Sequence, residues 1–289
     1  MKWLIMIRVF FFFLTVISSF GQVFSNDQLA TDLLELRPTK DKLILESNKK
    51  ALRLRVLCYN IHHAEGVDGK LDIPRIARVI LSVKPDLVAL QEVDQNTTRS
   101  GKVNQGSELS RLTKMQSVFG ANIKFQGGHY GNVILSRFPI VQKNNFHLPN
   151  FNSGEQRGLL ESLIKFPNEQ SVYFLATHLD HRRLDKERLD SAKFINQMNS
   201  VSNSNNRPAI LAGDFNDVPD SPTLKEFGKL WIRTNAEAAP TVPVMKPTRQ
   251  IDYIMVRPKE RWKVIKSRVL DESIASDHRA ILAVIELIN

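Results

Sequence analysis

Apolar residues along this chain recur with two spacings, one typical of strands and one typical of helices. Within the strand-like run 52–59, Leu54, Val56 and Cys58 recur at every second position, which predicts a half-buried strand. Residues 73–81 repeat their apolar positions every three to four residues behind Asp72 and Pro74, which favour the start of a helix. The same criteria predict further strands at 87–90, 132–135, 159–166, 172–176, 209–212, 251–256, 262–269 and 280–288, and further helices carrying Leu109, Leu112 and Phe119 and spanning 184–201.

This order of elements predicts an α/β fold in which two mixed β-sheets pack face to face and helices cover the outside. The 289 residues and 42% hydrophobic content suffice for one large core, so a second domain is not required. Residues 200–206 are typical of a polar loop. The single cysteine, Cys58, lies inside the first predicted strand and is expected to be a small core residue, not a nucleophile.

Four polar segments come at or just after the ends of predicted strands. They are Gln91-Glu92, Thr177-His178-Leu179, Gly213-Asp214-Phe215-Asn216 and Ser276-Asp277-His278. Strands in these positions could deliver every one of these polar groups to one rim of a sheet. Acidic and amide oxygens suit a hard divalent cation such as magnesium, and two histidines beside them supply donors for a phosphate that gains charge during reaction. The pattern indicates a metal-assisted phosphoesterase.

Seven ordered motifs extend this pattern from about Leu54 to the C-terminus. They are Tyr59-Asn60, Gln91-Glu92-Val93, Tyr130-Gly131-Asn132-Val133-Ile134-Leu135-Ser136-Arg137, Thr177-His178-Leu179, Gly213-Asp214-Phe215-Asn216, Ile251-Asp252-Tyr253 and Ser276-Asp277-His278. Each motif is weak alone, but in this order the chain resembles the endonuclease/exonuclease/phosphatase superfamily, which includes pancreatic deoxyribonuclease, abasic-site endonucleases, bacterial sphingomyelinases and inositol polyphosphate phosphatases. The resemblance implies a deoxyribonuclease-like sandwich and hydrolysis of a phosphodiester or phosphomonoester bond by activated water, and it fixes chemistry better than substrate.

The resemblance implies a magnesium site, with manganese as the alternative ion. Glu92 would be the principal ligand, with Asn60 close by and Asp277 contributing directly or through water. A cation held there polarises a phosphoryl oxygen and screens the charge of the incoming nucleophile. Whether one or two ions act stays open. His62 and His63 follow where abasic-site endonucleases typically carry an acidic residue, and they are either nitrogen ligands for a softer metal or rim histidines without a metal role.

The resemblance also implies the catalytic groups. Asp214 would orient and deprotonate the attacking water, helped by the amide of Asn216. His178 and His278 would donate to the non-bridging oxygens as the phosphorus becomes five-coordinate, and one of them would assist the leaving oxygen. Asp252 would hold His278 in place and keep it protonated, because a free imidazole with a pKa of about 6.5 is mostly neutral at neutral pH.

Three further residues are candidates for substrate binding. Asn132 either lines the site or closes a turn, and Arg157 meets either a substrate phosphate or an acidic neighbour. Arg188 follows the charged cluster Asp180-His181-Arg182-Arg183, which lies next to the end of a predicted catalytic strand. That cluster either contacts anionic substrate or forms the solvated start of a helix.

Residues 1–21 have the pattern of a secretory signal peptide. Lys2 and Arg8 form a short basic start, residues 9–17 are almost wholly apolar, and residues 18–21 offer small side chains for cleavage. An uncleaved anchor is the competing interpretation, but the apolar stretch is about a dozen residues long and a bilayer span needs roughly 20. We expect residues 22–50 to be an N-terminal extension and residues 51–289 to be the catalytic domain of a secreted or periplasmic protein.

The net charge of +10 favours anionic partners without choosing among them. Nucleic acid and small phosphodiesters rank together as expected substrates, and membrane lipid headgroups rank behind them. The only tryptophans beyond the leader, Trp231 and Trp262, have no aromatic neighbour that would help them insert into a bilayer. The Lys and Arg residues are spread widely instead of forming one basic stripe. We expect a monomer.

Three alternatives accompany the leading hypothesis. The chain could be a sphingomyelinase-like phospholipase C, or a catalytically silent domain of the same fold that binds a phosphorylated ligand. A zinc hydrolase built on His62, His63 and His178 is disfavoured because these residues lack the compact helical spacing usual for such sites.

Overall fold

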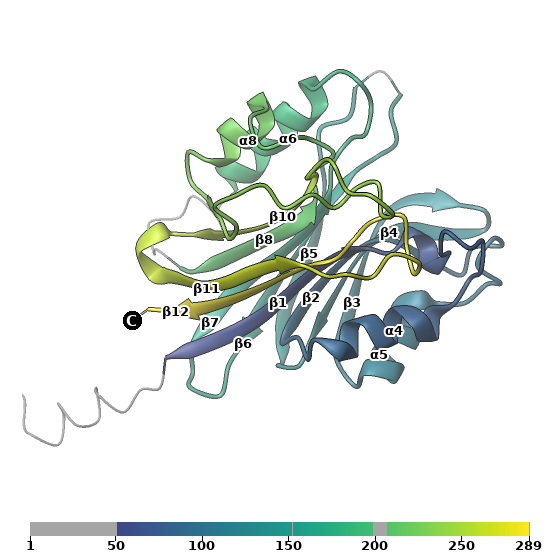
Figure 1. Cartoon of the computed structure of the whole chain (residues 1–289), viewed down its shortest axis with the longest axis horizontal. Helices are drawn as coiled ribbons and strands as arrows, with labels where there is room; N and C mark the ends of the chain where they lie inside the picture. The colour runs from purple at the N-terminus through teal and green to yellow at the C-terminus, as the bar shows by residue number, and fades with distance from the viewer. Residues whose placement is uncertain (1–50, 152, 199–206, 289) are drawn as a thin grey trace, which may run out of the picture. The chain divides into compact units, whose positions relative to one another are not determined.

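The computed structural model describes residues 51–151, 153–198 and 207–288, which form two mixed six-stranded sheets with helices on the outside (Figure 1). This architecture confirms the fold class expected from the sequence. The expected signal peptide (1–21), the extension (22–50) and the loop expected at 200–206 lie outside the described residues. Within the described ranges, no helix is both long enough and apolar enough to cross a membrane.

The first sheet has the strand order β11-β12-β1-β2-β4-β3. Strand β1 pairs with β2 in parallel and with β12 in antiparallel fashion, so it is a central strand of the sheet. The strands of this sheet are β1 (Leu52–Asn60), β2 (Leu87–Gln95), β3 (Gln116–Phe125), β4 (Gly128–Ser136), β11 (Trp262–Val269) and β12 (Ile281–Leu287).

The second sheet has the strand order β5-β6-β7-β8-β10-β9. Strand β8 pairs in parallel with β7 and antiparallel with β10. The strands are β5 (Ile140–His147), β6 (Gly158–Lys165), β7 (Ser171–His178), β8 (Ala209–Asp214), β9 (Ile232–Arg233) and β10 (Asp252–Arg257).

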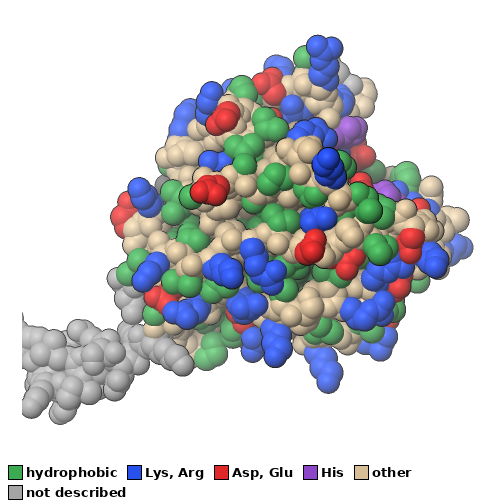
Figure 2. Space-filling view, in the orientation of Figure 1, with side chains coloured by type: hydrophobic (Ala, Val, Ile, Leu, Met, Phe, Trp, Pro, Cys, Tyr) green, Lys and Arg blue, Asp and Glu red, His purple; other side chains and the backbone are tan. Residues whose placement is uncertain are grey.

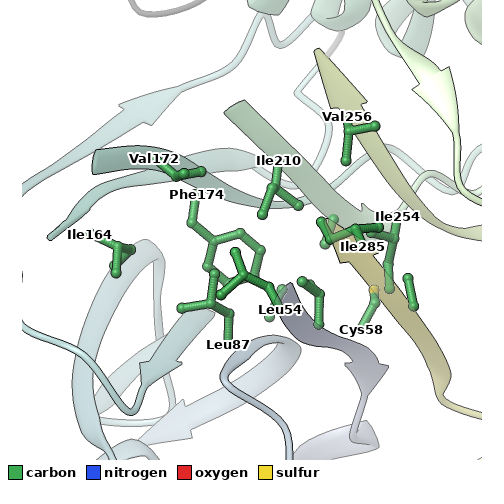
Figure 3. Close-up of a cluster of buried hydrophobic side chains, with 14 of the residues drawn as sticks. Leu54, Cys58, Leu87, Ile164, Val172, Phe174, Ile210, Ile254, Val256 and Ile285 are labelled. Atoms are coloured by element: carbon green, nitrogen blue, oxygen red, sulfur yellow. The ribbon is translucent and has the colours of Figure 1, made fainter. Parts of the chain in front are cut away.

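Apolar side chains from both sheets fill the interior of the sandwich (Figure 3). Strand β1 shows how the period-2 pattern produces two packed faces. Leu54 and Cys58 point into the interior cluster between the sheets, whereas Leu57 joins a second cluster under the outer helices. Cys58 is fully buried, which confirms its expected place in the core. Its burial, followed by the charges of Asp252 and Asp214, raises the pKa of the thiol, so it stays protonated.

Helices cover the outer face of each sheet (Figure 1). The first sheet carries α4 (Ile73–Ser82) and α5 (Gln105–Thr113), and the second carries α6 (Lys186–Gln197) and α8 (Pro222–Phe227). The Asp72 side chain caps α4 by accepting from the Arg75 N–H at 2.8 Å, and a proline lies in the first turn, as the sequence predicts. Short 3₁₀ turns occur at η2 (His62–Ala64) and η3 (Lys259–Arg261).

The structure corrects one predicted helix. Leu109 and Leu112 lie on α5, but Phe119 lies on β3. The helix ends because Lys114 adopts a left-handed conformation with φ 59°, and residues 116–125 then pair with β4. The apolar spacing of these residues fits a helix, but the break at Lys114 and the strand pairing override it. The helix expected at 184–201 occupies Lys186–Gln197 among the described residues.

Candidate active site

The strand directions bring the polar segments to one edge of the sandwich. Asn60 ends β1, and the Gln91-Glu92 segment belongs to the parallel neighbour β2. His178 and Asp214 end the parallel strands β7 and β8 and lie opposite each other in the register. Because β10 and β12 run antiparallel to these neighbours, the start of β10 at Asp252 and the loop before β12, which carries His278, reach the same edge.

The carboxylate of Asp214 lies at the centre of this edge. Its Oδ2 accepts a hydrogen bond from Asn60 Nδ2 at 3.1 Å. The same oxygen lies 3.4 Å from Nε2 of His178 and 3.7 Å from Nε2 of His278. Its Oδ1 accepts from the backbone N–H of Asn216 at 2.8 Å, which fixes the orientation of the carboxylate. Two imidazoles therefore converge on one oxygen.

Burial changes the acidity of Asp214. The side chain is almost fully buried, and its desolvation, followed by repulsion from Asp252, raises its pKa to about 7. The positive charge of His278 and the hydrogen bonds from Asn216 and Asn60 oppose this rise. The pKa of Asp214 therefore lies near neutral pH, and a general base is most effective when its pKa is close to the working pH.

His278 is held in its charged form by Asp252. Its Nδ1 donates to Asp252 Oδ2 at 2.9 Å, and the same oxygen accepts from the hydroxyl of Thr241 at 2.5 Å. Burial alone would lower the pKa of His278, but the charges of Asp252 and Asp214 outweigh it and raise the pKa to about 10. His278 is therefore an imidazolium at neutral pH, and its Nε2–H faces Asp214.

His178 is held in the opposite protonation state. Burial, followed by the charges of Arg157, His278 and His181, lowers its pKa well below the usual value. The Arg157 guanidinium lies 3.0 Å from Nδ1 and can only donate, so Nδ1 accepts and the proton of the neutral ring is on Nε2. Nε2 faces Asp214 Oδ2 at 3.4 Å, which can accept from it, whereas Asn216 Nδ2, 3.0 Å away, is itself a donor and makes no hydrogen bond to a protonated Nε2. His178 and His278 thus both direct an Nε2–H toward Asp214 Oδ2.

Glu92 and Asn60 form the part of the edge that suits a cation. Glu92 lies where the pairing of β2 with β4 shifts register, and its φ of 60° turns the side chain out of the regular strand. Its Oε1 accepts from Asn60 Nδ2 at 2.9 Å, whereas no described residue donates a hydrogen bond to its second oxygen. A carboxylate and an amide oxygen are the donors that magnesium prefers, so these residues fit the expected ion.

The sequence profile of the Endonuclease/Exonuclease/phosphatase family matches residues 57–278, a span that contains every residue of this edge. The chain belongs to this family. Its members hydrolyse phosphoester bonds and generally depend on a divalent metal ion. The superfamily resemblance inferred from the ordered motifs is confirmed.

Similar proteins agree with this membership. The uncharacterized protein YbhP of Escherichia coli K12 is 26% identical over 221 residues, which cover 70% of this chain and 84% of that protein. The crystal structure of an endonuclease/exonuclease/phosphatase from Beutenbergia cavernae matches with a TM-score of 0.68 at 27% identity, over 81% of this chain and 72% of that chain. The mannosyl-6-phosphatase of Bacteroides thetaiotaomicron matches with a TM-score of 0.67 at 20% identity, over 82% of this chain and all of that chain, and so shows the same fold.

Asp277, expected near the metal in this family site, is exposed at the rim next to His278. Ser276 donates to its Oδ1 at 3.3 Å, and the same hydroxyl also lies 2.8 Å from the backbone carbonyl of Asn60. Ser276 therefore ties the loop before β12 to the end of β1. Among the described acids, histidines and cysteine, Asp277 belongs to neither group whose ligand atoms lie within 4.8 Å of one another.

The three predicted substrate-binding residues lie in different surroundings. Asn132 is fully buried, with Nδ2 donating to the Gly158 carbonyl at 3.1 Å, and Oδ1 has no hydrogen-bond partner among the described residues. Arg157 lies behind His178 and also contacts Glu155 and His181. Their contact with substrate stays a prediction.

Arg188 lies beneath the surface beside the site. It donates to Asp217 at 3.1 Å and to the backbone carbonyls of Asp180 and Arg182. These bonds hold the segment after His178 against the loop after Asp214, so the guanidinium supports the site from below. Thr241, which contacts Asp252, was not anticipated from the sequence, because no local signal connects a loop threonine to a carboxylate on another strand.

Proposed function

We propose that this protein is a secreted, magnesium-dependent phosphoesterase that uses Asp214 to activate water against a phosphodiester or phosphomonoester bond. The convergence of a neutral His178 and a charged His278 on Asp214 Oδ2 carries the proposal. Family membership gives phosphoester hydrolysis, and this arrangement supports the assignment of roles.

Asp214 is suited to accept the proton of the attacking water. Its pKa of about 7 leaves a substantial carboxylate fraction at neutral pH while keeping it basic enough to take a proton. The N–H of Asn216 fixes one carboxylate oxygen at 2.8 Å and leaves the other facing the two histidines. Water bound between these groups would be aimed by the carboxylate and both rings.

The two histidines are suited to bind the phosphoryl oxygens. His278 presents a charged donor, because Asp252 keeps it protonated, and His178 presents a neutral donor, because Arg157 fixes its tautomer. Fixed donors directed at oxygens that gain charge lower the barrier more than they stabilise the ground state. His278, with its proton, is also the better group to assist the leaving oxygen.

Glu92 and Asn60 would hold the magnesium ion, whose chemistry is to polarise a phosphoryl oxygen and offset its charge. The unused oxygen of Glu92 and the carbonyl oxygen of Asn60 provide the donor set. Asn60 also donates to both Glu92 and Asp214, so one side chain fixes the position of the metal ligand relative to the base.

The substrate class we propose is a soluble phosphate ester, either nucleic acid or a small phosphodiester. Trp231 and Trp262 are buried, at 2% and 4% exposure, so neither can insert into a bilayer. Lys and Arg side chains are scattered among acidic and hydrophobic ones over the face shown in Figure 2. They form no continuous basic stripe on that face of the kind that binds a nucleic acid backbone. Because the mannosyl-6-phosphatase of Bacteroides thetaiotaomicron has a similar fold, sugar phosphates should also be tested as substrates.

Hydrolysis of bis-para-nitrophenyl phosphate by the purified chain tests the proposal. We expect turnover with magnesium and none after treatment with a chelator, and a strong loss in Glu92→Gln. Glu169→Gln is the matched control, because its carboxylate lies in an exposed surface ion pair with Lys165. Release that is independent of metal, or equal in Glu92→Gln and wild type, would overturn the proposed metal site. No release from bis-para-nitrophenyl phosphate, plasmid DNA, RNA, sphingomyelin or inositol phosphates would favour a silent binding domain.

Export is tested separately. We propose that residues 1–21 are removed on secretion, so that the mature chain begins near Gln22. N-terminal sequencing of the protein recovered from the exported fraction checks the cleavage position. A protein that keeps its first residues, or that stays with the membrane fraction, would contradict this part of the proposal.

A further inference from the structure

The turn directly after Asn60 has an unusual backbone. His62, His63 and Ala64 adopt positive φ angles of 44°, 42° and 62°, although none is a glycine. Such conformations cost free energy for residues with a side chain, and a run of three is retained only where the surroundings impose it. In a regular strand, neighbouring side chains point to opposite faces. Here the left-handed turn places the two imidazole rings with their centroids 4.5 Å apart.

The packing of this turn holds both rings by one of their nitrogens. His62 Nδ1 lies 3.1 Å from the backbone carbonyl of Glu65, and His63 Nε2 lies 3.2 Å from the Glu65 carboxylate. Gln105 further fixes the backbone by donating to the carbonyl of His63 at 2.6 Å. Each ring thus donates through one nitrogen and keeps the other available. This is the usual arrangement of histidines that bind metals, in which the outer N–H is held by a carboxylate or a carbonyl.

One of the two remaining nitrogens is an orphan. His63 is 7% exposed, and its Nδ1 is buried without a hydrogen-bond partner among the described residues. A buried acceptor of this kind calls for an explanation, and a bound ion is one that satisfies it. His62 and Glu92 are only partly buried, so solvent can reach the other side of the group.

Glu92 completes the cluster. One ligand atom from each of His62, His63 and Glu92 can be chosen so that all lie within 4.8 Å of one another. Two imidazoles and one carboxylate are a donor set typical of zinc and related ions, in contrast to the oxygen donors that magnesium requires. The partly open side leaves room for water or substrate in the remaining positions.

We propose that His62, His63 and Glu92 bind a divalent transition-metal ion, of the zinc or cobalt class, beside the magnesium ion expected at Glu92 and Asn60. Glu92 then contacts both ions, which places the second ion next to the position where the phosphate binds. Paired ions that share a carboxylate recur in phosphoesterases, where the second ion adds charge on the substrate side. Glu65 acts as a positioning residue, because it holds both rings without reaching the ion.

Titration of the purified, chelator-treated chain with Co²⁺ tests the proposal without relying on turnover. Visible absorption reports nitrogen-ligated cobalt, and calorimetry gives stoichiometry and affinity. We expect wild-type protein to bind Co²⁺ in the presence of excess magnesium. Glu65→Ala should weaken binding by about 10-fold, because loss of a residue that holds a metal ligand costs about 10- to 100-fold in affinity. His62→Ala and His63→Ala each remove a proposed ligand itself and should weaken binding by about 100-fold or more. His147→Ala is the matched control, because this histidine is exposed at the end of β5.

Two further variants separate this inference from the proposed reaction. Asp214→Asn should lower kcat by about 10³-fold while keeping the cobalt absorption, because Asp214 lies outside the cluster. His62→Gln keeps a polar side chain of similar size at a partly exposed position, so its loss of cobalt binding can be measured even where His63→Ala fails to fold. Cobalt binding with unchanged affinity and stoichiometry in His62→Gln would overturn the proposal, as would the absence of cobalt binding by wild-type protein.

Discussion

Two neighbouring groups at the same edge of the sandwich are built in different ways. The first, which we name the Asp214 cluster, comprises Asp214, Asp252 and His278. The second, the His62 cluster, comprises His62, His63 and Glu92. Asn60 connects them, because it donates to Asp214 and to Glu92 and accepts from the backbone N–H of His62.

The Asp214 cluster is placed by regular strands and is almost fully buried. Asp214 and Asp252 lie directly opposite each other on paired strands, and His278 offsets their charge. The His62 cluster depends instead on a left-handed turn and a strand irregularity. Each cluster has one buried atom without a hydrogen-bond partner among the described residues, Asp252 Oδ1 in the first and His63 Nδ1 in the second. Burial and charge pairing thus fix the protonation states of the Asp214 cluster, whereas the metal ligands that we propose in the His62 cluster are brought together by a strained turn.

Removing the base of the Asp214 cluster should have the largest effect. We expect Asp214→Asn to lower kcat by about 10³-fold, because an amide cannot accept the proton of the attacking water. The isosteric change keeps the hydrogen bond from Asn216, so folding should be preserved. Steady-state kinetics with magnesium and bis-para-nitrophenyl phosphate measure it. A kcat within threefold of wild type would remove Asp214 from the reaction.

Removing either histidine of the site should have the next largest effect. We expect His278→Ala and His178→Ala to lower kcat by about 10²-fold each, since each removes one donor to the phosphoryl oxygens. His147→Ala controls for loss of an exposed imidazole. If one of the two variants turns over at the wild-type rate, that histidine has no part in the mechanism.

Variants of Arg157 test whether this residue orients His178 or contacts the substrate. The guanidinium fixes the tautomer of His178 from behind, so Arg157→Met should lower kcat by about 10-fold through misorientation and leave KM little changed. A substrate contact, as expected from the sequence, would instead raise KM. Measuring both constants for Arg157→Met and Arg157→Lys distinguishes the two roles, and a rise in KM alone would contradict the positioning role.

The smallest expected effect is the change in thermal stability of the protein when a metal binds to the His62 cluster. A metal that binds only the folded chain stabilises it by about 2.7 kcal/mol when its concentration is 100 times Kd. We expect Co²⁺ to raise the Tm of wild-type protein accordingly and to raise that of His62→Ala much less. Thermal unfolding followed by circular dichroism, with and without chelator, checks this. Equal shifts in both proteins would place the stabilising ion elsewhere.

The sequence predicts the regular parts of the fold well, for a physical reason. Leu54, Val56 and Cys58 recur at every second position of β1 because they face the other sheet. Leu57 and Tyr59 pack under the helices, so the end of β1 is apolar on both faces, and the apolar runs near β2, β6, β7 and β8 likewise reflect burial. The pattern misleads around Phe119, where apolar spacing fits a helix but pairing with β4 decides the structure. Strand β5 escaped prediction because half of its residues are exposed and polar.

The candidate site was predictable as a set of residue types but not as a geometry. Ordered motifs identified Glu92, Asp214 and His278, since each lies near the end of an apolar run or before the next one. The contact of Thr241 with Asp252 and the tautomer that Arg157 imposes on His178 arise from side chains that meet only in the folded chain. The left-handed turn at His62 carries no glycine, so the usual sequence signal for positive φ is missing there.

The dependence of turnover on pH tests the central claim most directly, namely that Asp214 acts as a base beside a charged His278. Asp214 must lose its proton, so the rate should rise as the pH passes about 7, and His278 must keep its proton, so the rate should fall as the pH passes about 10. In Asp252→Asn the alkaline limb should move to lower pH, because the main influence that keeps His278 charged is lost. A rate that keeps rising above that alkaline limb, or an Asp252→Asn profile that superimposes on the wild-type profile, would contradict the account.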